Sequence, residues 1–414
     1  MNSLRRQQGL VGSISPVQFK YRANEALYKT LDRAETQFPQ AHSGAVNSLA
    51  VDSLEQRFLL TGGGDASLKI WDLGETVVDS VGDTKYKCLE EIPRKDGHSF
   101  GVSHVQWWPF DNGLFVSSSF DNTVKVWDAN VLAEAYSFNL ENKIYNFDIS
   151  SLGDHSLVAT AADHPYVRLL DLRTTSSSHT LVAHSGKVLS VKWSPRSAHE
   201  LASAGSDGTV RLWDIRRANA CVESLDMGRT SEQPSRTPMQ YRKAHRASVN
   251  GLCWFPAGDF LVSSGNDEKI RVWGMRSPGD SSAGGRNMLV NFGPLVRNRF
   301  LQTLDPCLSP SSDLQTPYLF FPSDNGELFM FQAVDGKIVK RLTPPSTRTT
   351  SSSIRTACII PRGPGHLQFL SGALDGSITV WSPNVAVEPE QKDVELLGEK
   401  KPTVLDDIWK SIHF

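Results

Sequence analysis

The stretch that decides the fold is HSGKVLSVKWSPRSAHELASAGSDGTVRLWD, residues 184–214. It begins with a histidine, ends with Trp-Asp, and contains two β-type segments that flank the tripeptide Ser206-Asp207-Gly208. An Asp-Gly pair between two such segments is a strong signal for a β-hairpin, because both residues tolerate the backbone conformation of a tight turn. Residues 184–214 therefore predict consecutive antiparallel β-strands.

Four stretches of the chain share this pattern, and in each of them an Asp lies six residues before the Trp. A hydroxyl residue lies four residues before each Asp, and the spacings from His to Asp are 23, 23, 23 and 22 residues. The four sets are His42, Thr61, Asp65 and Trp71; His98, Ser117, Asp121 and Trp127; His184, Ser203, Asp207 and Trp213; and His245, Ser263, Asp267 and Trp273. This regular recurrence is typical of a repeat protein, in which each repeat is one structural unit.

Three further stretches are imperfect copies of the same pattern. One retains Ser371, Asp375 and Trp381 but has no matching His, and the other two carry Leu170 and Phe331 in place of the Trp. The copy that ends near Leu170 also has Ala159 where the hydroxyl residue is expected. Seven copies predict an all-β fold, a seven-bladed β-propeller over residues 25–382.

The recurring His, hydroxyl, Asp and Trp resemble the structural tetrad of the WD-repeat family. The resemblance implies that the Asp accepts a hydrogen bond from the His, the His contacts the hydroxyl, and the hydroxyl contacts the Trp nitrogen. Buried polar groups must find partners inside the protein, so such side chains are expected to occur as a complete set.

Closure of the ring is expected near the N-terminus. Residues Glu25–Leu31 are predicted to supply the outer strand of the last blade, which removes an exposed sheet edge. The overlapping stretch VQFKYRANEALYKTL, residues 17–31, also fits a short helix. Residues 1–24 are then a short helical N-terminal extension and residues 383–414 a C-terminal tail. Three inserts rich in Ser, Pro, Thr or Arg are predicted to form loops, at residues 227–243, 276–286 and 343–353.

Composition disfavours several functional classes. The net charge is -2 and no basic run is present, which predicts little or no direct DNA binding. The five cysteines are widely spaced without a C-x-x-C pair, which favours a reducing compartment over a disulfide framework or a zinc ribbon. No segment has the length and apolarity of a signal peptide core or a membrane helix, so we expect no membrane association and a nuclear location.

The His, Ser and Asp side chains could also be mistaken for a catalytic triad. A triad occurs once and needs an oxyanion hole, whereas this set occurs four times at matched spacing. The histidines show no H-E-x-x-H or other clustered ligand spacing, so no metal and no cofactor are expected. The chain is accordingly predicted not to be an enzyme, and a hydrolase that uses one of the four sets is retained as an alternative.

Two blades carry an Arg two residues after the Asp that follows the Trp column, where the chain leaves the blade at the bottom rim. These pairs are Asp171 with Arg173 and Asp214 with Arg216. The segment LASAGSDGTVRLWDIR resembles the W-D-x-R box of the substrate receptors of cullin-4 RING ubiquitin ligases. This resemblance implies docking onto the damaged-DNA-binding adaptor subunit of the ligase, and insertion of an N-terminal segment that carries Leu4, Leu10 and Val11 into that adaptor.

Longer blocks resemble the Cockayne syndrome A family of WD-repeat proteins. They are VQWWPFDNGLFVSSSFDNTVKVWDAN at 105–130, SVKWSPRSAHELASAGSDGTVRLWDIRRANACVESLD at 190–226 and NMLVNFG at 287–293. The resemblance implies a substrate receptor in transcription-coupled nucleotide excision repair, whose partners are the adaptor, a Cockayne syndrome B-type ATPase and the RNA polymerase II elongation complex. A WD-repeat scaffold without a link to a ligase remains the alternative.

Overall fold

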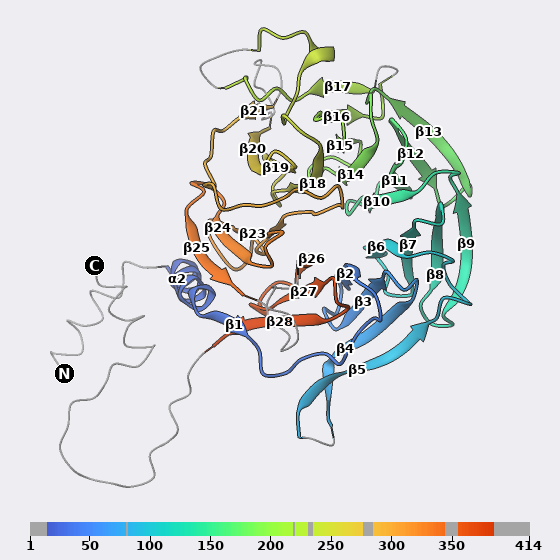
Figure 1. The fold of residues 1–414 in the computed structure, drawn as a ribbon, viewed down its shortest axis with the longest axis vertical. Coiled ribbons are helices and arrows are strands. Elements are labelled where there is room, and N and C mark those ends of the chain that lie inside the picture. Colours follow the sequence, from blue (N-terminus) through green and yellow to red (C-terminus); the bar gives the residue numbers. More distant parts are fainter. Residues whose placement is uncertain are drawn as a thin grey trace, which may run out of the picture.

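A computed structural model describes residues 15–79, 82–217, 220–230, 235–275, 285–343 and 355–384. The chain forms seven four-stranded antiparallel sheets arranged in a ring around a central channel (Figure 1). The prediction of a seven-bladed β-propeller is therefore confirmed. The seven strands that contain the predicted Trp-column residues all lie third from the channel.

Six blades are built from four consecutive strands each, and the seventh takes its outer strand from the N-terminal part of the chain. Blades one to three are β2(Val46–Val51), β3(Phe58–Gly63), β4(Leu68–Val78) and β5(Thr84–Ile92); β6(Val102–Trp107), β7(Leu114–Ser119), β8(Thr123–Asp128) and β9(Ala133–Asn139); β10(Ile144–Ile149), β11(Leu157–Ala162), β12(Tyr166–Asp171) and β13(Ser176–Val182). Blades four and five are β14(Val188–Trp193), β15(Glu200–Gly205), β16(Val210–Asp214) and β17(Cys221–Ser224); β18(Val249–Trp254), β19(Phe260–Gly265), β20(Lys269–Gly274) and β21(Arg286–Asn287). Blades six and seven are β22(Cys307–Leu308), β23(Tyr318–Pro322), β24(Leu328–Gln332) and β25(Ile338–Leu342); β26(Thr356–Pro361), β27(Phe369–Ala373), β28(Ile378–Pro383) and β1(Leu31–Arg33).

The two faces of the ring are defined by their loops. The bottom face carries the loops between the first and second strands and between the third and fourth strands of each blade. The top face carries the loops between the second and third strands and the connections between blades. The tetrad His and Asp lie toward the top face, and the Asp-x-Arg pairs lie on the bottom face.

Ring closure differs in detail from the sequence prediction. The segment Glu25–Leu31 is not a strand, because helix α2(Pro16–Lys29) occupies it as far as Lys29. The closing strand is β1, which begins at Leu31 and pairs antiparallel with β28. The helix predicted over residues 17–31 is present, and Ser15 caps its N-terminus in a capping box with Gln18.

The three predicted loop inserts fall partly outside the described residues. In the insert at 227–243, the described residues form no strand and contain only the 3-10 turn η1(Met239–Tyr241). The predicted bounds 276–286 extend one residue too far, because Arg286 already belongs to strand β21. Of the insert at 343–353, only Thr343 lies within the described part of the chain.

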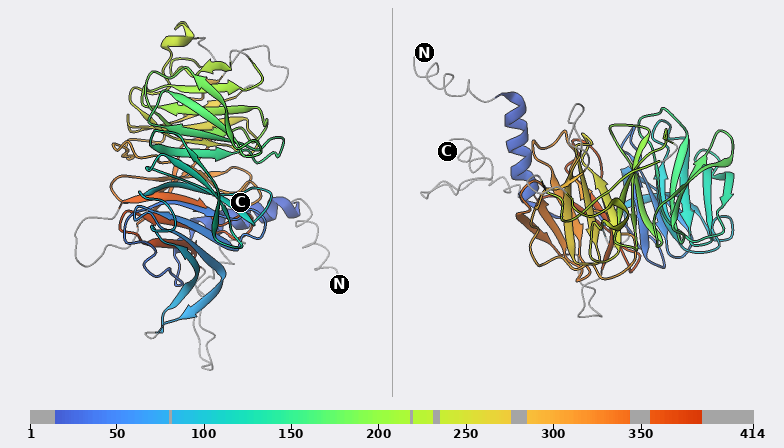
Figure 2. Two further views of the ribbon diagram at one scale, coloured as in Figure 1. Left: turned by 90° about the vertical axis from the view of Figure 1, so that its right-hand side faces the viewer. Right: turned by 90° about the horizontal axis from the view of Figure 1, so that it is seen from above.

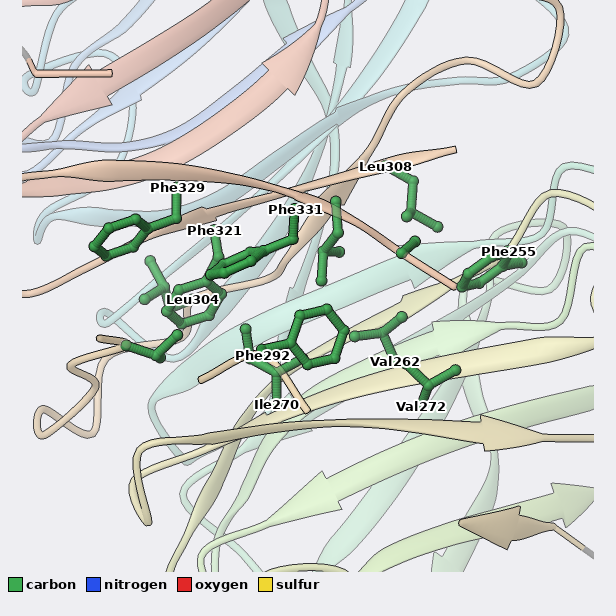
Figure 3. Packing of buried hydrophobic residues seen from close by; sticks show 13 residues of the cluster. Phe255, Val262, Ile270, Val272, Phe292, Leu304, Leu308, Phe321, Phe329 and Phe331 are labelled. Carbon is green, nitrogen blue, oxygen red and sulfur yellow. The ribbon is translucent and has the colours of Figure 1, made fainter. Parts of the chain in front are cut away.

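The core lies between neighbouring blades. Figure 3 shows one interface, a cluster in which Phe292 lies between Val262 and Val272 of blade five and Phe321 and Phe331 of blade six. Burying a large apolar side chain contributes about 2–3 kcal/mol, so each blade is stabilised mainly by its neighbours.

The degenerate third blade replaces three of the four tetrad members with apolar side chains. Leu140, Ala159 and Leu170 occupy the His, hydroxyl and Trp positions, and all three are buried. The Asp position is kept as Asp163, which pairs with Lys187 instead. Replacing all the buried partners of a hydrogen bond by apolar groups costs little, whereas removing one of them leaves the others without a partner. This explains how the blade keeps its fold without the repeat signature.

The central channel is organised by Asp305, at the end of the connection between blades five and six. Its carboxylate accepts hydrogen bonds from Asn146 Nδ2 (2.9 Å), Ser190 Oγ (2.9 Å) and the Leu252 backbone N–H (3.0 Å), and Lys192 Nζ lies 3.1 Å away. Asp305 thereby ties blade six to blades three, four and five at a point where the inner strand β22 has only two residues. It lines a cavity of about 460 Å³.

A second channel carboxylate, Asp148, is poorly compensated. Lys192 Nζ is 3.9 Å from one of its oxygens, and the other accepts the Trp193 N–H at 2.6 Å. Burial dominates these favourable contacts and raises the pKa of Asp148 to about 6.

We therefore predict a pH-dependent stability difference for Asp148→Asn. The pKa of Asp148 is about 6 in the folded state and about 3.9 in the unfolded state, so protonation of Asp148 stabilises the fold. This stabilisation is fully present below about pH 4 and is lost as the pH rises through 6. The variant-minus-wild-type difference in Tm should be more positive at about pH 7.5 than at about pH 5, as measured by thermal melts. The exposed Asp154→Asn is the matched control. A pH-independent difference for Asp148→Asn would contradict the assignment.

Candidate functional site on the bottom face

The four predicted tetrads are assembled in the structure. His Nε2 lies 2.7–2.9 Å from the hydroxyl oxygen, Trp Nε1 lies 2.7–3.2 Å from the same oxygen, and His Nδ1 lies 2.8–3.3 Å from the Asp carboxylate. A Trp N–H can only donate and a carboxylate can only accept, so the hydroxyl donates to His Nε2 and His Nδ1 donates to the Asp. Blade seven keeps only the contact from Trp381 Nε1 to Ser371 Oγ, at 2.8 Å.

The tetrads are protected from solvent and their charges are held in place. Ser117, Ser203 and Ser263 are fully buried, which leaves no path for a substrate carbonyl to reach their oxygens. Burial opposes ionisation of Asp121, Asp207 and Asp267, but hydrogen bonds from the His outweigh it and hold the pKa of each carboxyl far below its usual value. Burial also lowers the pKa of His184 and His245, which favours the neutral ring that the network requires.

The Asp-x-Arg pair of blade four forms a rigid charged corner on the bottom face. Asp214 is buried, and its carboxylate accepts two hydrogen bonds from the Arg216 guanidinium at 3.0 Å and one from the Arg216 backbone N–H at 3.1 Å. Arg217 adds an ion pair at 3.3 Å. The Arg216 hydrogen bonds hold the pKa of Asp214 below its ordinary value. The Arg216 side chain is nevertheless 59% exposed, so one edge of the guanidinium remains open to a partner.

The pair of blade three has a different internal geometry. Asp171 accepts the backbone N–H of Arg173 at 2.9 Å, but within the described residues no acidic side chain forms an ion pair with the Arg173 guanidinium. Arg173 lies beside His155 and His179 in a cleft of about 450 Å³ that also touches Ile215, the residue between Asp214 and Arg216. The blade-three pair therefore lines this cleft, whereas the blade-four pair lies outside its lining and is represented there only by Ile215, between Asp214 and Arg216.

A third arginine on this face was missed by the sequence analysis. Arg57, at the end of the loop between β2 and β3, binds Asp72 through two hydrogen bonds of 2.6 and 2.9 Å. Asp72 is the Asp of the Trp-Asp pair in blade one, so that blade also presents an arginine beside this position, although Gly74 replaces the arginine of the motif. Arg57 lies 15 residues before Asp72, and no local spacing indicates the contact. In blade two, Asp128 instead accepts the backbone N–H of Asn130.

Helix α2 stands on the same bottom face. Tyr28 is fully buried between the rings of Tyr318 and Phe369, and its hydroxyl donates to Asp313 at 3.1 Å. Asn24 Nδ2 donates to the Asp313 backbone carbonyl at 2.9 Å, which attaches a second turn of the helix to blade six.

The first residues of α2, 16–20, are exposed. Figure 2 shows the helix projecting away from the disc, and Val17 and Phe19 near its start are 55% and 50% exposed. Leu4, Leu10 and Val11, which were predicted to contact an adaptor, lie outside the described residues. The bottom face therefore combines a projecting helix with charged corners on blades one, three and four.

Within the described ranges, no group of three or more His, Cys, Asp or Glu side chains could hold a metal ion. No helix of the described chain is long and apolar enough to cross a membrane.

Comparisons with known proteins agree with the geometry. The WD domain, G-beta repeat model (WD40) matches residues 34–72, 87–128, 175–214 and 236–274, which correspond to the four blades with complete tetrads. The WD repeat-containing protein ATCSA-1 of Arabidopsis thaliana is 30% identical over 432 aligned residues, which cover 88% of this chain and 91% of that protein.

The chain belongs to the WD-repeat family. Two partial relatives are also similar. Radiation-sensitive protein 28 of Saccharomyces cerevisiae is 30% identical over 42% of this chain and 38% of its own length. The ribosome biogenesis protein WDR12 homolog of Drosophila mojavensis is 29% identical over 56% of this chain and 52% of its own length.

WD-repeat geometry leads to a stability prediction for Ser203→Ala. Loss of the hydroxyl leaves the buried His184 Nε2 and Trp213 Nε1 without a partner, at a cost of about 1–3 kcal/mol of unfolding free energy. Thermal and urea unfolding should show this loss, and Ser151→Ala, at an exposed position, should show none. A hydrolase that used Ser203 would instead lose activity with unchanged stability, and that result would overturn the structural assignment.

Proposed function

We propose that this WD-repeat protein is the substrate-recognition subunit of a cullin-4 type E3 ubiquitin ligase that acts in transcription-coupled nucleotide excision repair. The observation that carries the proposal is the pair of Asp-x-Arg corners on the adjacent blades three and four, which lie on the bottom face that also carries helix α2. This is the arrangement expected of a surface that docks onto the damaged-DNA-binding adaptor subunit of such a ligase.

The physical chemistry of arginine supports a docking role. Its planar guanidinium forms paired hydrogen bonds with carboxylates and backbone carbonyls, and arginine is enriched among interface residues that dominate affinity. Asp214 holds Arg216 in one orientation before binding, so little side-chain entropy is lost on docking. Arg173 brings a guanidinium to the cleft whose charge a partner carboxylate can neutralise.

The relatives support the repair branch of the proposal. ATCSA-1 aligns over nearly the whole of both chains, and its name agrees with the resemblance to the Cockayne syndrome A family. The name of Radiation-sensitive protein 28 refers to radiation sensitivity, and the chain spans 38% of that protein.

The proposed mechanism involves no chemistry by this chain and no cofactor. The bottom face would hold the adaptor, and the top face would hold a stalled RNA polymerase II elongation complex and a Cockayne syndrome B-type ATPase in the nucleus. Tethering raises the effective concentration of target lysines near the RING subunit, without any new catalytic group. Recognition of the lesion through the polymerase is consistent with a net charge of -2 and requires little or no direct DNA binding.

A second candidate function is a WD-repeat scaffold without a ligase link. The ribosome biogenesis protein WDR12 homolog and ribosome biogenesis protein YTM1 of Meyerozyma guilliermondii favour it, although the chain spans about half of each of these proteins. Such a scaffold has no need for paired arginine corners that bind the ligase adaptor.

The double variant Arg173→Ala with Arg216→Ala separates the two functions. We expect each substitution to weaken adaptor binding by about tenfold or more, since an interface arginine of this kind contributes about 1–2 kcal/mol. The measurement is co-purification of the adaptor, followed by titration with the purified proteins. Arg94→Ala with Arg341→Ala, two exposed positions away from the cleft, is the matched control. Recovery of the adaptor at wild-type yield with the Arg173→Ala, Arg216→Ala double variant would contradict docking at this face.

Affinity purification after transcription-blocking damage tests the repair assignment separately. The adaptor and elongating RNA polymerase II should both be recovered with the wild-type chain. Recovery of ribosome-assembly factors without the adaptor would favour the scaffold instead.

A further inference from the structure

The connection between blades five and six, from β21 to β22, forms a strap across the top face, residues 295–305. It belongs to the orange segment between β21 and β23 in Figure 1. Its residues alternate between the interior and solvent. Val296, Asn298 and Leu304 are buried, whereas Arg297, Arg299, Phe300 and Leu301 are exposed. Residues 295–305 form no helix or strand. The buried side chains anchor the segment, and this keeps the exposed side chains directed toward solvent.

Hydrogen bonds and apolar packing hold the strap against blade five. Asn298 and Asn250 exchange two amide hydrogen bonds at 2.8 and 2.9 Å, and the Leu304 N–H donates to the Asn250 carbonyl at 2.9 Å. Leu304 also belongs to the apolar cluster between blades five and six (Figure 3). A Cβ at Gly251 would lie 2.0 Å from the Leu304 carbonyl oxygen, so only glycine permits this approach.

An apolar surface lies on top of this strap. Phe300 and Leu301 are 55% and 53% exposed, although the residues on both sides of them are fixed. The Arg355 guanidinium lies 4.6 Å from the centre of the Phe300 ring and supports it from blade seven. The backbone carbonyl of Arg355 accepts the N–H of Leu374, which is 38% exposed and extends the same surface over that blade.

The charged groups next to this apolar surface that are most exposed to solvent are positive. Arg297 and Arg299 both pair with Glu268, and their side chains are 46% and 67% exposed, whereas the Glu268 side chain is 25% exposed. The other nearby acid, Asp324, is 8% exposed, and its carboxylate accepts the Arg299 backbone N–H at 2.5 Å and lies 2.7 Å from Arg355. Two exposed guanidinium groups therefore share one largely covered carboxylate.

We propose that the strap surface, formed by Arg297, Arg299, Phe300, Leu301 and Leu374, binds an acidic amphipathic segment of a partner protein. Apolar side chains of that segment cover Phe300, Leu301 and Leu374, and its carboxylates pair with the two arginines. The proposal deepens the receptor function above and rests on it only for the identity of the recruited protein. A single-stranded nucleic acid fits less well, because a base can stack on the single ring of Phe300 but leaves the aliphatic Leu301 and Leu374 uncovered.

The test uses a fluorescein-labelled peptide of about 15 residues, with Leu and Phe on one helical face and Glu on the other. Binding to the full chain is measured by fluorescence anisotropy at several salt concentrations. We expect Arg299→Glu and Phe300→Ser each to weaken binding by about tenfold or more, and Arg299→Lys to retain most of it. Val131→Ser, at a 73% exposed position on the bottom face, is the matched control and should bind as the wild type does.

Three results would overturn the proposal. They are equal binding of a peptide with Lys in place of Glu, wild-type affinity in both Arg299→Glu and Phe300→Ser, and displacement of the peptide by a single-stranded oligonucleotide at lower concentration than by unlabelled peptide. Arg299 and Phe300 are each more than half exposed, so both variants are expected to fold, and thermal melts confirm this independently. The double variant Arg173→Ala with Arg216→Ala should bind the peptide normally, so failure of the adaptor hypothesis and failure of this one are distinguishable.

Discussion

In four of the seven blades, one buried hydroxyl oxygen accepts the Trp Nε1 proton and donates its own proton to a histidine. This oxygen joins the second and third strands of the blade to the loop that precedes the first strand. The histidine extends the chain of hydrogen bonds to an Asp at the tip of the hairpin, where the carboxylate orders the turn. These hydrogen bonds fix the positions at which the loops leave the strands. The two proposed binding surfaces are built from such loops, so their arrangement depends on the tetrads.

The repeated tetrads explain why much of the fold was predictable. Each set has four members at nearly constant spacing, and loss of one member of a buried polar network leaves its partners unsatisfied, which favours complete sets. The degenerate blades were recognised from strand and turn patterns alone, because Leu170 and Phe331 continue the core with apolar contacts. Ring closure was misplaced at Glu25–Leu31, since tertiary packing of Tyr28 favours a helix at a stretch that precedes a three-residue strand.

The functional surfaces were less predictable from the sequence. The two Asp-x-Arg pairs are local motifs, and the structure adds that only the blade-three pair lines a cleft. Arg57 reaches Asp72 from the loop between β2 and β3, and the strap contacts residues from blades five, six and seven. Neither the Arg57–Asp72 contact nor the strap contacts follow a regular spacing in the sequence, so neither could be predicted from it. The outcome is a disc with two chemically distinct faces: charged corners and a projecting helix below, and an apolar, arginine-flanked strap above.

Hydrogen–deuterium exchange of the chain with and without the damaged-DNA-binding adaptor tests the central claim most directly. Amide protection should increase in residues 171–176 and 214–217 and in α2, while residues 297–301 on the top face should exchange unchanged. Protection confined to the top face, or none on the bottom face at saturating adaptor, would contradict the account.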